Sequence, residues 1–72
     1  MFHAVIQSES GRPFRVSGQV VPYDLQVLRE HVLARAGRRT RVEVRFPPAL
    51  RPALERALRD LARHGVDLVL EA

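Results

Sequence analysis

The chain carries one five-residue stretch twice, as Leu33-Ala-Arg-Ala-Gly37 and again as Leu61-Ala-Arg-His-Gly65. Each copy ends in glycine and is followed by a valine-bearing segment that alternates in polarity. Glycine is typical of the position just past a helix, because the chain there turns left-handed and a Cβ would be strained. The repeat therefore predicts two helices, each ending at its glycine and each leading into a strand.

Four segments alternate between apolar and polar residues, which is the period of a β-strand. They are residues 2–7, 14–20, 40–46 and 66–71. The first two are joined by a turn at residues 8–13 that contains Gly11 and Pro13, so we expect them to form a hairpin.

Two further segments repeat apolar residues at helical spacing. The first helix is expected to begin at Pro22, and the second between residues 49 and 52, because Pro52 fits only a first turn. The element order is then ββαβαβ. Each strand is mostly polar on one face, so both helices are expected on the other. The sequence thus predicts one α/β domain over residues 1–72, a two-layer sandwich of a four-stranded mixed sheet with two helices on one face.

The order of the strands within the sheet is less constrained. Right-handed crossovers favour parallel, consecutive positions for the second, third and fourth strands, with residues 2–7 antiparallel at an edge. Insertion of residues 2–7 between other strands is the main alternative. The residues expected to be buried together are Val42, Val44, Leu54, Leu58, Leu61 and Leu68.

The composition excludes several classes of protein. The chain has no cysteine, so it has neither a disulfide framework nor a thiolate metal site. No apolar run approaches the roughly 18 residues of a membrane helix, and the first residues do not resemble a secretory signal. All 12 basic residues are arginine and the net charge is +4, a usage typical of GC-rich genomes. We expect a cytoplasmic, bacterial protein with no membrane contact.

Catalytic groups do not form a recognisable pattern. His3, His31 and His64 lie on separate predicted elements, and no serine has a neighbouring histidine or lysine base. Asp60 could pair with His64, four residues later on the same helix. We therefore expect no catalytic, cofactor-binding or metal-ligating residues, and a protein that is not an enzyme.

A weaker alternative is a small ligand site at the carboxyl ends of the parallel strands, where α/β folds bind ligands. Loops at that end would bring together Tyr23, Asp24, Arg51 and Glu71.

Four arginines surround the predicted end of the first helix: Arg35, Arg38, Arg39 and Arg41. They could contact the phosphates of a nucleic acid or another anion. Cations at this position also complement the helix dipole, which accounts for them without a ligand.

Tyr23 and Val27 are one helical turn apart on the side away from the apolar stripe, and they form a candidate partner contact. The polar sheet face is expected to carry cross-strand ion pairs, or alternatively a polar subunit interface.

The element order from Phe14 to Leu70 is similar to that of STAS domains, interaction modules that include anti-sigma-factor antagonists. The family's phosphoacceptor loop would follow the third strand, where this chain has Phe46-Pro-Pro-Ala-Leu50 without a serine. The family's final helix has no counterpart either. The chain is therefore not identified as a member, and the resemblance in element order carries no function.

These features favour a small non-enzymatic protein-interaction or assembly module. A short chain without disulfides gains from burying surface against a partner, and an uncapped sheet edge can pair with a further strand. The partner would be another protein or a second copy in a homodimer. The alternative is weak nucleic-acid binding through the arginine cluster at residues 35–41.

Overall fold

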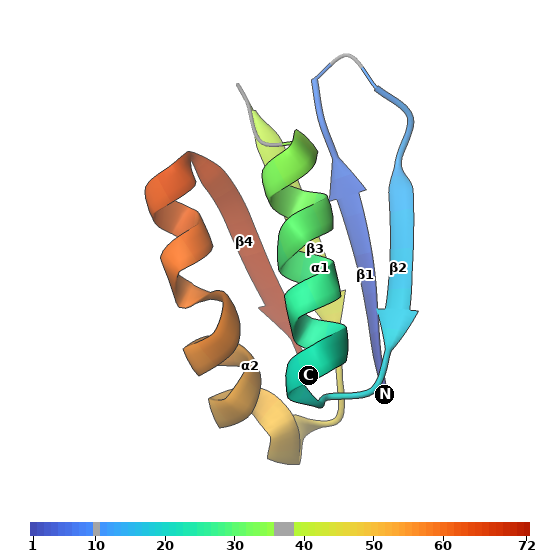
Figure 1. Cartoon of the computed structure of the whole chain (residues 1–72), viewed down its shortest axis with the longest axis vertical. Helices are drawn as coiled ribbons and strands as arrows, with labels where there is room; N and C mark the ends of the chain where they lie inside the picture. The colour runs from blue at the N-terminus through green and yellow to red at the C-terminus, as the bar shows by residue number, and fades with distance from the viewer. Residues whose placement is uncertain (10, 36–38) are drawn as a thin grey trace.

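The computed structural model describes residues 1–9, 11–35 and 39–72. Four strands form one mixed sheet, and both helices pack against the same face of it (Figure 1). The predicted order ββαβαβ and the two-layer α/β fold are confirmed. The elements are β1 (Phe2–Gln7), β2 (Phe14–Gly18), α1 (Pro22–Arg35), β3 (Thr40–Arg45), α2 (Arg51–Leu58) and β4 (Val66–Glu71).

The favoured prediction, that the first strand lies at an edge, is wrong, and the alternative, insertion between other strands, is confirmed. The strand order is β2-β1-β3-β4, and β1 is antiparallel to both of its neighbours. Only β3 and β4 are parallel neighbours, although β2 runs in the same direction as both. The hairpin holds β1 beside β2, and the connection through α1 spans β1 before it reaches β3. In this central place β1 makes hydrogen bonds on both sides, and its residues Phe2, Ala4 and Ile6 are almost fully buried.

A single core lies between the sheet and the helices. The predicted core residues Val42, Val44, Leu54, Leu58 and Leu61 are completely buried. Leu68 packs against this core but is only partly buried, because β4 is an edge strand. From α1, the core receives Leu25, Leu28 and Val32.

The second helical segment is less regular than predicted. A 3-10 turn, η1 (Pro48–Leu50), precedes α2, and a longer one, η2 (Arg59–His64), follows it. Short 3-10 segments of this kind are common at the ends of α-helices. Pro52 lies in the first turn of α2, as predicted. Gly65 ends η2 with a φ of 78°, which confirms the second glycine stop, whereas Gly37 lies outside the described residues.

The chain leaves β2 at Gly18, two residues earlier than predicted. The Gln19 N–H donates to Oδ2 of Asp24 at 2.8 Å, which draws the chain toward the start of α1. A Cβ at Gly18 would lie only 3.1 Å from the Asp24 side chain, so glycine suits this close approach. At the other end of α1, the Thr40 hydroxyl donates to the Arg35 carbonyl at 3.2 Å.

Candidate functional site

The strand β4 lies at one edge of the sheet, beside α2 (Figure 1), and in the described part of the chain it pairs only with β3. The Phe46 N–H donates to the Glu71 carbonyl at 3.1 Å. Both backbone polar groups of a residue in a parallel strand point to the same side, and successive residues alternate. The groups of residues 67, 69 and 71 therefore point toward β3. Those of residues 66, 68 and 70 point toward the open edge.

On the inner face of β4, Val66 is buried, but the two leucines that follow it are incompletely covered by the helices. Leu68 and Leu70 are only partly buried, although both pack against the core. Beside them is a hollow of about 360 Å³. Its lining residues are Glu55, Arg59, Ala62, Val66, Asp67, Leu68 and Leu70. Partly exposed apolar surface thus lies next to unpaired backbone groups.

The opposite edge, β2, is protected from further pairing. It is only five residues long, follows Pro13 and has the charged Arg15 near its centre. Short length, proline and charge are the features that usually protect an edge strand. The Phe14 ring is covered as well, since the Arg35 guanidinium lies 3.8 Å from its centroid and the His31 ring 5.0 Å. By contrast, β4 has six residues and no proline, and its two charged residues, Asp67 and Glu71, are both acidic.

The open face of the sheet carries balanced charges. Arg45 pairs across strands with Glu71 at 3.3 Å, and Arg41 pairs with Glu43 on its own strand at 3.1 Å. Among the described residues, this face carries no phenylalanine or tyrosine, because the phenylalanines of the sheet face the helices. It therefore lacks the large aromatic rings on which base-stacking sheets usually rely.

The hairpin brings His3 next to Ser17, a contact that the sequence interpretation missed. Nδ1 of His3 lies 3.0 Å from Oγ of Ser17, because the two residues are direct cross-strand partners. The hairpin register was the signal that could have revealed this pair. In the described part of the chain no carboxylate hydrogen-bonds to His3, so the pair lacks the third group that orients a catalytic histidine.

The structure describes three arginines of the predicted cluster, while Arg38 lies outside the described residues. Each of the three has an intramolecular partner, for which a phosphate would have to compete. These partners are the His31 carbonyl for Arg35 (3.2 Å), Glu9 for Arg39 (3.7 Å) and Glu43 for Arg41 (3.1 Å). Nucleic-acid binding through this cluster stays a prediction.

The other candidate contact is smaller than expected. Tyr23 is 77% exposed, whereas Val27 is half-buried. Tyr23 instead has an exposed apolar neighbour along the chain, Val21, which is 43% exposed. The exposed apolar surface at this point therefore belongs to the start of α1.

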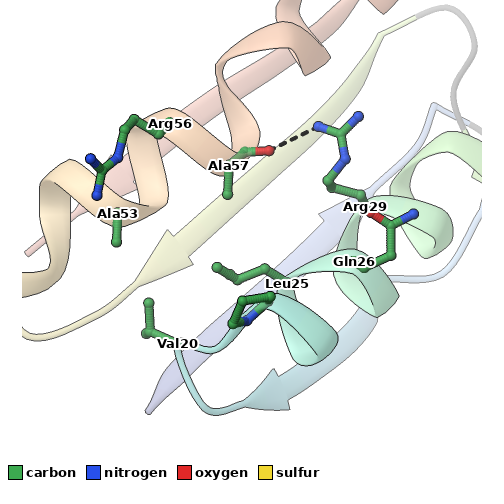
Figure 2. A pocket seen from close by; sticks show the side chains of 8 residues that line it. Val20, Leu25, Gln26, Arg29, Ala53, Arg56 and Ala57 are labelled. Atoms are coloured by element: carbon green, nitrogen blue, oxygen red, sulfur yellow. Dashed lines mark hydrogen bonds between the residues drawn. The ribbon is translucent and has the colours of Figure 1, made fainter.

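A groove of about 430 Å³ separates α1 from α2 (Figure 2). Ala53 and Ala57, one helical turn apart on α2, are short side chains and leave this space open. The lining residues are Val20, Pro22, Leu25, Gln26, Arg29, Ala53, Arg56 and Ala57. None of them has a carboxylate, hydroxyl or imidazole group, so the groove contains neither a nucleophile nor a general base.

The residues of the alternative ligand site do not line this groove. Three of them are engaged elsewhere: Asp24 with the Gln19 N–H, Arg51 with Glu55 (3.6 Å) and Glu71 with Arg45. The fourth, Tyr23, is exposed.

One end of the groove is held by Arg29. Its Nη1 donates to the Ala57 carbonyl at 2.8 Å (Figure 2). The same guanidinium donates to both carboxylate oxygens of Asp60, with Nη2 to Oδ2 at 2.8 Å. This bidentate pair ties α1 to η2. The hydrogen bond from Arg29 lowers the pKa of Asp60 below its ordinary value of 3.8, and it raises the pKa of Arg29.

Acid is expected to weaken this tie. Because the pKa of Asp60 is lowered in the folded state, the stabilisation is fully present above the ordinary pKa of 3.8 and is lost as the pH falls through the folded-state pKa. In chemical unfolding, the wild type should have a higher free energy of unfolding than Asp60→Asn. This difference should be constant near neutral pH and shrink below about pH 4. Glu30→Gln, at an exposed carboxylate of α1, is the control and should show no such change. A difference that persists unchanged into strong acid would contradict the assignment.

Among the described residues, no group of three or more histidine, aspartate or glutamate side chains is arranged to hold a metal ion. In the same part of the chain, neither helix combines the length and apolar character needed to cross a bilayer.

Comparisons with protein-family models, curated proteins and solved structures give no significant match. The similarity to STAS domains in element order is therefore not accompanied by a family match. The two most distinctive surfaces of the described chain are the β4 edge and the groove between α1 and α2.

Proposed function

We propose that this protein is a non-enzymatic assembly module that pairs with a second copy of itself through the open edge of β4. The observation that carries the proposal is the contrast between the two sheet edges. The edge at β2 is short and protected, whereas β4 presents unpaired backbone groups, within the described chain, beside partly exposed leucines. Addition of a strand to such an edge is a common mode of recognition.

When two β4 strands pair antiparallel about a two-fold axis, the outward backbone groups of each copy form hydrogen bonds with those of the other. In the register centred on Leu68, residues 66, 68 and 70 of one copy face residues 70, 68 and 66 of the other. These are the residues whose backbone groups point outward, so their donors and acceptors meet. Asp67 then faces Val69. A register centred on Val69 would instead set Asp67 against Glu71, a like-charge pair that destabilises a sheet.

The Leu68-centred register also supplies charge complementarity. Glu71 of one copy faces Gly65 of the second copy, whose preceding residues Arg63 and His64 are exposed. The acidic end of each β4 thus approaches the basic end of η2 in the other copy. This complementarity favours a second copy over an unrelated strand as the occupant of the edge.

Sedimentation equilibrium tests this function directly. We expect a monomer–dimer equilibrium at micromolar protein concentration. A strict monomer up to about 100 μM, which limits the association free energy to roughly −5.5 kcal/mol, would contradict the proposal.

Val69→Lys tests the register. In the Leu68-centred dimer each new lysine faces Asp67 of the other copy, so dimerisation should be maintained or strengthened by about 0.2–1 kcal/mol for each of the two symmetric pairs. A register centred on Val69 would set the two lysines against each other and weaken the dimer. Val5→Lys is the matched control, because it adds the same charge to the same face on the central strand β1. It should leave the dimerisation constant unchanged.

A further inference from the structure

We infer that the groove between α1 and α2 binds an acidic, amphipathic helical segment of another protein, with an apolar side chain between the helices and a carboxylate at Arg56. The inference does not depend on pairing at β4, because the groove and the β4 edge have no lining residue in common.

The floor of the groove is apolar and has room for a side chain. Its volume of about 430 Å³ falls within the roughly 300–1,000 Å³ typical of ligand sites. Leu25 contributes from α1, while Ala53 and Ala57 are too short to fill the space from α2. An inserted leucine or phenylalanine would cover surface that the chain itself leaves open (Figure 2).

Two exposed apolar residues are next in sequence to residues of the groove, at the start of α1. Val20 and Pro22 line the groove, and the residues that follow them, Val21 and Tyr23, are 43% and 77% exposed. An occupant longer than one side chain could therefore stay in apolar contact as it leaves the groove. This continuity favours a segment with several apolar residues along one face over a small molecule.

The charge at the rim selects an acidic segment. Arg29 is already bound to Asp60 and to the Ala57 carbonyl. Arg56 also lines the groove, but it makes no ion pair in the described part of the chain. Its neighbours on the second helical segment differ, since Arg51 and Arg59 both lie near Glu55, at 3.6 and 4.0 Å. Arg56 is thus placed to bind a carboxylate from outside.

A labelled model peptide provides the test. The probe is a fluorescein-labelled helix of leucine, alanine and glutamate with its leucines along one face, and the comparison peptide has lysine in place of glutamate. Fluorescence anisotropy should give saturable binding of the acidic peptide with a Kd on the order of 100 μM or tighter. The lysine peptide should bind at least several-fold more weakly. The titration is then repeated with Leu68→Lys protein, in which pairing at β4 is strongly weakened. Because the groove does not depend on that pairing, the peptide should bind this variant as it binds the wild type.

Two substitutions with matched controls locate the site. Arg56→Gln should weaken binding of the acidic peptide about two- to fivefold, as expected for loss of a solvent-exposed ion pair at the rim of the groove. Arg15→Gln removes an arginine without a described ion pair from the open sheet face and should have no effect. Ala53→Glu should abolish binding by filling the groove with a negative charge. Ala34→Glu adds the same charge on the exposed face of α1 and should not.

Several results would overturn the inference: equal binding of both peptides, equal weakening by Arg56→Gln and Arg15→Gln, or no saturable binding up to about 1 mM. Displacement of the peptide in step with self-association would make the groove an interface between copies and would also overturn it. If Ala53→Glu fails to fold by circular dichroism, the surface substitutions Arg56→Gln and Arg15→Gln still decide the question.

Discussion

Leu58→Ala is expected to lower the free energy of unfolding by about 2–5 kcal/mol. Leu58 is the last residue of α2, and its side chain is completely buried in the core. Removing the side chain loses its transfer free energy and leaves a cavity that the surrounding sheet and helices can close only in part. A chain of 72 residues has a total stability of roughly 4–11 kcal/mol, so the variant should be close to unfolding.

Urea unfolding followed by far-ultraviolet circular dichroism measures this loss. The matched control is Leu33→Ala, the same chemical change at a leucine of α1 that is 37% exposed, and it should cost less than about 1 kcal/mol. Equal losses for the two variants would mean that Leu58 does not occupy the core described here.

Leu68→Lys is expected to weaken self-association by roughly 100-fold, which corresponds to about 2.7 kcal/mol. In the Leu68-centred register this residue faces its own copy across the two-fold axis. The substitution therefore sets two lysines against each other and removes two apolar side chains from the interface.

Sedimentation equilibrium measures the dimerisation constant of this variant. Val16→Lys is the matched control, because Val16 is likewise a partly buried, core-packed residue of an edge strand, β2. It should reduce stability to a similar extent but leave the dimerisation constant unchanged. Equal dissociation of both variants would show that loss of stability, rather than loss of the β4 edge, separates the copies.

The local periods of the sequence were sufficient to predict the elements of the fold. The alternation along residues 40–46 is a local pattern, and so is the glycine after each of the two similar helix ends. The two-layer arrangement follows from the polar face of each strand, which places both helices on the other face. The place of β1 does not follow from such patterns. A strand with one polar face has the same alternation at an edge and at the centre of a sheet, so Phe2 and Ile6 could not distinguish the two positions.

The contacts that position the candidate sites were harder to predict, because they join distant segments. Arg29 and Asp60 are 31 residues apart, and their meeting depends on how α1 and η2 pack together. From sequence alone, His64 was the nearer partner for Asp60. The expected strand order already placed residues 66–71 at an edge, but it gave the opposite edge to β1 instead of β2. Tyr23 could be placed correctly at the surface because its helical face is a local property.

The central place of β1 also orders the formation of the sheet in time. The β1–β2 hairpin needs only a short loop to close, whereas the pairing of β1 with β3 must wait for α1 to span the hairpin, a slower, non-local event. The pairing of β3 with β4 is more local in the chain than that of β1 with β3, so the unit of β3, α2 and β4 can also form early. The pairing of β1 with β3 then joins this unit to the hairpin. The central strand is therefore the junction between two halves of the sheet, each of which is connected locally.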